Sequence, residues 1–79
     1  MRLDKYLKLS RLIKRRTLAA QACTAGRVTV NGKAAKASYE VKIGDIIEIR
    51  FGSNTPKVEV ISLKEIVRKE EANLMYKTL

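Results

Sequence analysis

The sequence predicts a small α+β domain in which two to three short helices pack on a small antiparallel β-sheet, followed by a short C-terminal extension. Three observations carry this prediction. The first stretch spaces its apolar side chains at the helical period and an alanine-rich stretch after it is a good helix former, later runs alternate polar and apolar side chains, and an Asn-Gly pair follows one of these runs. A chain of 79 residues also has little room for an enclosed active site, which favours a binding module over an enzyme.

The first helix is predicted over residues 2–9, where one side is apolar and the other is basic. The basic side chains on its outer face are Arg2, Lys5 and Lys8. Basic residues recur at every third position up to residue 14, and one unbroken helix would spiral them away from any single face. We therefore expect a break near Ser10. Such a break would gather a second basic patch beside the first, formed by Arg11, Lys14 and Arg15.

The second helix is predicted over about residues 17–25. Thr17 is the expected N-cap because its hydroxyl can accept a hydrogen bond from the free amides of the first turn. Gly26 stands where a left-handed C-cap belongs. The alanines of LAAQACTA allow this helix to approach the first one closely, and we expect Cys23 to pack between them. A reactive thiol is the alternative for Cys23, although nothing near it in the sequence resembles a general base.

A β-hairpin follows the second helix. RVTV alternates polar and apolar side chains, and the next two residues, Asn31 and Gly32, form the preferred dipeptide for a type I′ turn. We expect KAAK, residues 33–36, to return as the partner strand.

Two more strands and a tail complete the prediction. VKIGDIIEIRF contains a Gly-Asp turn and predicts a third strand, or a strand pair, at roughly residues 46–51. GSNTP reads as a loop, and KVEVI, residues 57–61, reads as another strand. Ser62 and Glu65 match a capping box, which predicts that a helical or turn-rich tail begins there.

Positive charge is confined to one half of the chain. The formal net charge is +9, and residues 1–36 hold ten lysines and arginines against a single acid, Asp4. Residues 37–79 hold seven basic and seven acidic residues, so they contribute no net charge. A solubility surface would mix the two signs throughout. The one-sided distribution instead indicates a face that binds a polyanion.

The residue inventory argues against catalysis, metals and membranes. The chain has no histidine, one cysteine and no glycine-rich phosphate loop, so we expect no enzyme activity, no cofactor and no metal site. Asp4 is expected to orient its basic neighbours Arg2, Lys5 and Lys8 by ion pairing rather than to act as a catalytic acid. The single cysteine cannot form an internal disulfide, which fits a reducing, cytoplasmic setting, and no targeting segment or membrane span is visible.

The basic residues form the candidate site. Lysines and arginines on a rigid helix pair suit phosphate contacts, and the scarcity of aromatic residues favours folded, double-helical RNA over stacked single strands. The candidate RNA-binding residues are Arg2, Lys5, Lys8, Arg11, Lys14, Arg15, Arg16, Thr17, Arg27, Asn31, Lys33 and Lys36.

Residues 1–50 resemble the RNA-binding domain named after ribosomal small-subunit protein four. Four motif pieces carry the resemblance together, namely RLDKYL, SRLIKRRT, AGRVTVNGK and VKIGDIIEI. The resemblance implies an αL-type RNA-binding domain over residues 1–51, with structured RNA bound across the helix face. Residues 52–79 would then be a C-terminal extension, a strand plus a short helical tail, within the same compact unit.

The neutral ending RKEEANLMYKTL and the stretch NGKAAKAS are similar to the RqcP family of bacterial ribosome-associated quality-control factors. That resemblance implies a monomer that binds the obstructed large ribosomal subunit through its rRNA and peptidyl-tRNA. It also implies cooperation with an RqcH-type factor that adds alanine tails to stalled chains. The alternatives are a heat-shock-type large-subunit recycling factor or general structured-RNA binder, and an RNA-modifying enzyme or detached enzyme module.

Overall fold

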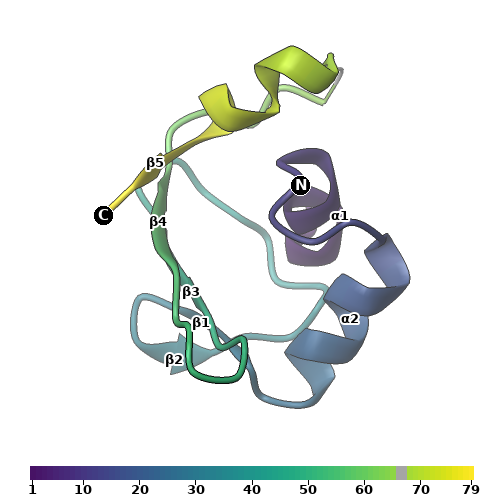
Figure 1. Ribbon diagram of the computed structural model, residues 1–79, viewed down its shortest axis with the longest axis vertical. Coiled ribbons are helices and arrows are strands. Elements are labelled where there is room, and N and C mark those ends of the chain that lie inside the picture. The colour runs from purple at the N-terminus through teal and green to yellow at the C-terminus, as the bar shows by residue number, and fades with distance from the viewer. Residues whose placement is uncertain (66–67) are drawn as a thin grey trace.

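The computed structural model of the chain describes residues 1–65 and 68–79. Within these residues, two α-helices lie on one side of a five-stranded antiparallel sheet, as Figure 1 shows, and a short 3-10 helix leads into the last strand. The elements in chain order are α1 (Leu3–Leu9), α2 (Arg16–Thr24), β1 (Val28–Val30), β2 (Lys33–Ala34), β3 (Ile46–Ile49), β4 (Lys57–Val60), η1 (Lys69–Met75) and β5 (Tyr76–Thr78). The strand order across the sheet is β2-β1-β3-β4-β5. The predicted α+β class is confirmed.

The core lies between the helices and the sheet. The predicted apolar side of α1 is confirmed, because Leu3, Tyr6 and Leu7 are fully buried and Ser10 is buried just after the helix. Each strand of the sheet interior buries alternate residues, as the two-residue period of a strand requires. Among the described residues, no helix has the length and apolar character needed to cross a membrane.

Cys23 is a packing residue of α2. It is buried in the same core cluster as Ala19 and the apolar side of α1. Burial raises the pKa of the Cys23 thiol to about 11, and the negative charge of Asp4 adds to the increase. A thiol that stays protonated at neutral pH is a poor nucleophile, so the structure favours the packing role over the reactive one.

The connection from β2 to β3 caps α1. In Figure 1 this connection runs past both helices before it returns to the sheet. The Leu3 amide donates to the Tyr39 carbonyl at 2.8 Å, and the Asp4 amide donates to the Ala37 carbonyl at 3.1 Å. These backbone bonds satisfy amides at the start of the helix that have no partner inside it. As a result, α1 begins at Leu3, one residue later than predicted.

The predicted break near Ser10 is confirmed. Ser10 closes α1, and Arg11 follows it with a positive φ of 62°. This is a left-handed conformation that residues with a side chain adopt at a cost of roughly 1–2 kcal/mol. The turn places Ile13 in the core and allows α2 to pack back against α1.

The predicted N-cap of the second helix was wrong, whereas its C-cap was right. α2 begins at Arg16, and its N-cap is Arg15, which has an extended backbone and makes no capping bond through its side chain. At the other end, Gly26 has a φ of 73°. Its amide donates to the Cys23 carbonyl at 3.0 Å, and the next amide, that of Arg27, donates to Ala22 at 2.9 Å. This pair of bonds is the Schellman arrangement that ends many helices at a glycine.

The predicted Asn-Gly turn is confirmed. Asn31 and Gly32 have φ values of 53° and 85°, and Val30 pairs with Lys33 across the two-residue loop. The returning strand is shorter than the predicted residues 33–36, because β2 ends at Ala34. After one more backbone bond, the chain leaves the sheet to cap α1.

The second half of the sheet was predicted only in part. β3 ends at Ile49 and β4 ends at Val60, each one or two residues earlier than expected. The predicted capping box was wrong, because the Ser62 hydroxyl accepts a bond from the Lys64 amide at 3.3 Å and residues 61–64 are not helical. Residues 66–67, where that helix would continue, lie outside the described residues.

The tail adds a strand that the sequence pattern did not predict. β5 pairs with β4, with Tyr76 opposite Val60. The buried Tyr6 hydroxyl of α1 also donates to the Met75 carbonyl at 2.6 Å. Met75 is therefore bonded to the first helix, and β5 directly after it is bonded to the sheet.

Candidate nucleic-acid interface

A buried carboxylate organises the N-terminal end of both helices. Asp4, in the first turn of α1, is only 4% exposed. Arg2 donates to both of its oxygens, from Nε to Oδ1 and from Nη2 to Oδ2, each at 3.2 Å. Arg16, the first residue of α2, places its Nε 3.5 Å from Oδ2. The backbone amide of Lys5 donates to Oδ1 at 2.8 Å. One carboxylate therefore holds two arginines, one just before α1 and one in the first turn of α2.

The charge on Asp4 is favoured despite its burial. Burial alone would raise the pKa of this carboxyl, but the hydrogen bonds from Arg2, the Lys5 amide and Arg16 outweigh it and lower the pKa. Asp4 is thus a carboxylate at neutral pH. The predicted ion pairing of Asp4 is confirmed for Arg2, while for Lys5 and Lys8 it is wrong. The Lys5 ammonium pairs with Glu65 at 3.4 Å, and Asp4 takes Arg16 as its second arginine.

The arginine pair is suited to contact phosphates. The Arg2 and Arg16 side chains are 49% and 48% exposed. Asp4 uses Nε and Nη2 of Arg2 and only Nε of Arg16, which leaves the other guanidinium N–H groups without a bond to it. Arginine presents its donors in a rigid fork, so fixing one side of the fork also fixes the direction of the free donors. The arrangement is pre-organised to bind an anion.

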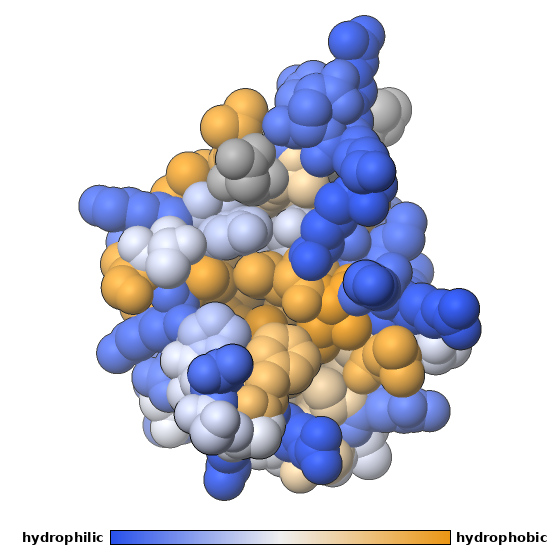
Figure 2. Space-filling view, in the orientation of Figure 1, coloured by the Kyte–Doolittle hydropathy of each residue, from blue (hydrophilic) through white to orange (hydrophobic). Residues whose placement is uncertain are grey.

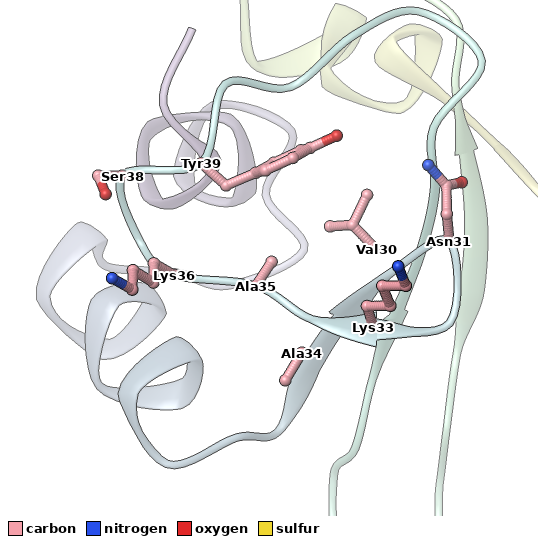
Figure 3. Close-up of a pocket in the computed structure, with 8 residues that line it drawn as sticks. All are labelled: Val30, Asn31, Lys33, Ala34, Ala35, Lys36, Ser38 and Tyr39. Carbon is pink, nitrogen blue, oxygen red and sulfur yellow. The ribbon is translucent and has the colours of Figure 1, made fainter.

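Two hollows extend the Arg2 site toward the hairpin. Arg2 and Lys36 line one of about 520 Å³, together with the C-terminal residues of α2. Lys33 and Lys36 line the next, of about 630 Å³, and small residues such as Ala34 border both. In Figure 3 the ring of Tyr39 reaches across the second hollow, while Lys36 points toward the helices. The two hollows thus form a continuous path from Arg2, past Lys36, to Lys33.

A second basic group surrounds the turn between the helices. Lys8, Arg11 and Lys14 line a hollow of about 370 Å³. This confirms that the break near Ser10 gathers a basic patch, although Lys8 takes the place predicted for Arg15. Arg15 and Thr17 are exposed at the start of α2.

Arg27 and Asn31 differ from the other candidates. Arg27 lies beyond the C-terminal end of α2 and lines a hollow with Arg50, apart from the arginine pair at Asp4. The Asn31 side chain accepts a bond from the Ile46 amide at 2.9 Å and donates to the Asp45 carboxylate at 3.1 Å. Asn31 thus joins two turns of the fold, and its place among the RNA-binding residues remains a prediction.

Asp45 is a second buried carboxylate, and it lies beside the hairpin turn that carries Asn31. Asp45 also accepts bonds from the Tyr39 hydroxyl and the Lys42 amide, both at 2.9 Å. Burial alone would raise the pKa of Asp45, but the Lys42, Asn31 and Tyr39 bonds lower it. Sequence reasoning treated Gly-Asp only as a turn and missed this network, which depends on residues brought together by the fold.

The comparisons with known proteins cover the whole chain. Residues 1–47 match the family described as the S4 domain. An "RQC P-site tRNA stabilizing factor" of Halalkalibacterium halodurans is 60% identical over 96% of this chain and 86% of that protein. The protein of the same name from Bacillus subtilis is 54% identical over 100% of this chain and 92% of that protein. A heat shock protein 15 homolog of Haemophilus influenzae is 34% identical over 96% of this chain but only 59% of that protein.

Solved structures share the fold over the full length of the chain. A trimeric structure of heat shock protein 15 from Vibrio cholerae superposes with a TM-score of 0.93 at 34% identity, and covers 100% of this chain and 81% of that one. The solution structure of a hypothetical protein, HP1423, superposes with a TM-score of 0.83, also at 34% identity, and covers 100% and 96% of the two chains.

Proposed function

The chain belongs to the S4-domain family of RQC P-site tRNA stabilizing factors, and on this basis we propose that it is an RNA-binding factor of ribosome-associated quality control. It binds the obstructed large ribosomal subunit through rRNA and through the peptidyl-tRNA that the subunit retains. By holding that tRNA in place, it supports C-terminal alanine tailing of the stalled chain by an RqcH-type factor.

The observation that carries the proposal is the pair of arginines on Asp4. A buried carboxylate that draws two half-exposed arginines together builds a fixed phosphate-binding group at the surface. The lysines of the hairpin and the basic group at the inter-helix turn extend this cationic surface on either side. We propose that helical RNA binds across this surface through its backbone and shape.

The proposed action requires no chemical step. A binding factor can favour one state of the particle only if it binds that state more tightly than the other. By linkage, a factor that binds the tRNA-loaded subunit more tightly than the empty one also slows the loss of the tRNA from it. The factor is thus expected to consume no nucleotide and to make no alanine tails alone.

The test is a paired binding measurement at one fixed salt concentration. Purified large subunits that carry peptidyl-tRNA and subunits that lack it are titrated with the protein, and alanine tails are measured in a reconstituted reaction with and without it. We expect tighter binding to the loaded subunits and a higher yield of tails. Equal affinity for the two particles, with no change in tail yield, would overturn the quality-control proposal.

A second candidate is a heat-shock-type recycling factor, favoured by the full-length match to heat shock protein 15 structures. The chain spans only 59% of the Haemophilus influenzae homolog. A recycling factor is expected to bind the loaded subunit without raising tail yield. The tailing arm of the same experiment therefore separates the two candidates.

A further inference from the structure

One face of α2 carries an apolar hollow that lies apart from the arginine pair at Asp4, although Arg27 of the candidate RNA-binding residues lines it. The hollow is about 420 Å³ and lies between α2 and the residues that follow β3. Its lining residues are Ile13, Leu18, Gln21, Ala22, Ala25, Arg27 and Phe51. In Figure 2 apolar side chains gather between the sheet and the helices, framed by hydrophilic ones. The hollow is therefore a candidate for contact with a partner rather than with water.

Two large apolar side chains are exposed at this hollow, and one of them stands on a backbone turn closed by two hydrogen bonds. Leu18 is 49% exposed and Phe51 is 43% exposed. Phe51 and Asn54 exchange backbone hydrogen bonds at 2.7 Å in both directions, around a two-residue turn. An aromatic side chain has few rotatable bonds and therefore loses little conformational freedom on binding, which is a property of residues that dominate protein interfaces.

Positive charge adjoins the apolar hollow. Arg27 and Arg50 line a neighbouring hollow of about 270 Å³, and the Arg50 amide donates to the Arg27 carbonyl at 2.8 Å. Neither guanidinium forms an ion pair with a carboxylate in the part of the chain that the structure describes. A partner that fits both hollows must therefore present an apolar group beside negative charge.

The composition of this surface differs from that of the RNA-binding surface. The RNA-binding surface combines arginines with lysines such as Lys33 and Lys36, whereas no lysine of the described residues 1–65 and 68–79 lines either of these two hollows. Aromatic residues and arginine are enriched at protein interfaces, and lysine is depleted there. Aliphatic walls such as those of Leu18 and Ile13 also offer few partners to the polar edge of a nucleobase. The features favour a protein partner over a nucleotide.

We propose that this surface docks a protein of the loaded ribosomal particle, through a segment in which an apolar side chain lies beside one or more carboxylates. The inference rests on the proposed function, because it assumes binding to the particle. Arg16 and Leu18 are two residues apart on α2, which separates their directions by roughly 200° around the helix axis. RNA and protein can thus occupy opposite sides of α2 at the same time.

The test compares one particle with and without its proteins. Wild type, Leu18→Ala and Phe51→Ala are titrated onto large subunits carrying peptidyl-tRNA, and onto protein-free rRNA extracted from the same particles. Each variant is expected to lose about tenfold in affinity for the intact particle, as for an interface residue that contributes about 1.4 kcal/mol, and to bind the free rRNA like wild type. Charge reversal of Arg50 to Glu is expected to show the same selective loss.

Two controls keep the outcomes distinct. Leu79→Ala removes an apolar side chain of similar exposure, 54%, that is not among the residues lining this hollow, and should change neither affinity. Arg2→Ala should weaken binding to both targets, and its failure to do so would contradict the proposed function rather than this inference.

An equal loss of affinity for rRNA and for intact particles in the Phe51 variant would show that the hollow binds RNA. An unchanged affinity for both would show that it binds nothing. Either result overturns the protein-docking proposal, provided that thermal unfolding confirms that the variants fold.

Discussion

At Asp4, one carboxylate that is nearly inaccessible to solvent holds two arginines, one just before α1 and one at the start of α2. In the proposed binding of RNA, its contribution is geometric, because its charge alone would repel phosphate. Replacing it with asparagine raises the net charge by one and should nevertheless weaken RNA binding, by about tenfold if the arginine pair supplies about 1.4 kcal/mol. A surface that acted only through total charge would bind more tightly. The measurement is a titration of structured RNA with wild type and Asp4→Asn.

Glu65→Gln is the matched control for this substitution. Glu65 is an exposed carboxylate that pairs with Lys5 at 3.4 Å, so its removal raises the net charge by the same amount without touching the arginine pair. We expect its RNA affinity to match or slightly exceed that of wild type. Equal weakening by both substitutions would contradict the role of Asp4 as an organiser of the surface.

Asp4 should also make the stability of the fold dependent on pH. Its pKa is lower in the folded protein than the ordinary value, since the bonds from Arg2, the Lys5 amide and Arg16 outweigh the effect of burial. Its contribution is therefore complete above the unfolded pKa, about 3.9, and is lost as the pH falls through the folded pKa. Denaturant unfolding of wild type should show a loss of stability below about pH 4. Asp4→Asn should lose less stability over that range. The pH dependence that remains includes the contribution of Asp45, whose pKa is also lowered in the folded protein.

Arg11 occupies a backbone conformation that suits glycine better than arginine. Its φ of 62° carries a steric cost for any residue with a Cβ atom. Arg11→Gly should therefore be more stable than Arg11→Ala, by up to about 1 kcal/mol, as measured by chemical denaturation. Both variants should lose RNA affinity to the same extent, because both lack the guanidinium. A loss of RNA affinity in Arg11→Ala alone would instead mean that Arg11 acts through the shape of the turn.

Among the elements, the Asn-Gly hairpin is tied to the following turn by the Asn31 side chain. Asn31→Gly keeps the positive φ but removes the bonds to Ile46 and Asp45, which should cost about 1–3 kcal/mol in unfolding free energy. Asn31→Ala should cost more, because alanine also strains the turn. Chemical denaturation of the two variants separates the side-chain bonds from the backbone conformation. Similar stabilities for Asn31→Gly and wild type would show that the side chain contributes little.

The helices and the hairpin could be predicted from local sequence because each has its own signal. The apolar period of α1, the glycine that ends α2 and the Asn-Gly dipeptide all act within a few residues. β5 could not be predicted, because Tyr76–Thr78 has no alternating pattern of its own and is a strand only by pairing with β4. The capping box predicted at Ser62 was wrong because of another contact between distant segments. Backbone bonds to Met75 hold Ile61 and Ser62 outside a helix.

The candidate site could also be predicted from local sequence only in part. Its basic residues were evident from charge alone, but the pairing of Arg16 with Asp4 spans two helices and appears only after they pack. The grouping of Arg27 with Arg50 depends on the pairing of β1 with β3, since Arg27 directly precedes β1 and Arg50 directly follows β3, so no local pattern indicates it. The division of the chain at residue 51, into an RNA-binding domain and an extension, remains our proposal.

At the scale of the whole molecule, the distribution of charge should determine how binding responds to salt. In the second half of the chain, Lys57 pairs with Glu48 at 3.5 Å and Lys64 pairs with Glu71 at 3.9 Å, so these lysines are partly neutralised by neighbours. The excess positive charge belongs to residues 1–36. If about five phosphates are neutralised on binding, the logarithm of the affinity should fall with the logarithm of salt at a slope of roughly −3.5 to −4.5.

Two triple charge reversals test whether this slope belongs to one surface. Reversing Lys8, Lys14 and Lys36 to glutamate should flatten the slope by about two to three, because each lost phosphate contact removes roughly 0.7–0.9 from it. Reversing Lys57, Lys64 and Lys77 changes the net charge equally but lies outside the proposed surface. Its slope should stay close to that of wild type, with a small loss of affinity from long-range repulsion that disappears at high salt. Equal flattening by the two sets would mean that RNA samples the whole molecule, and that the one-sided surface does not direct binding.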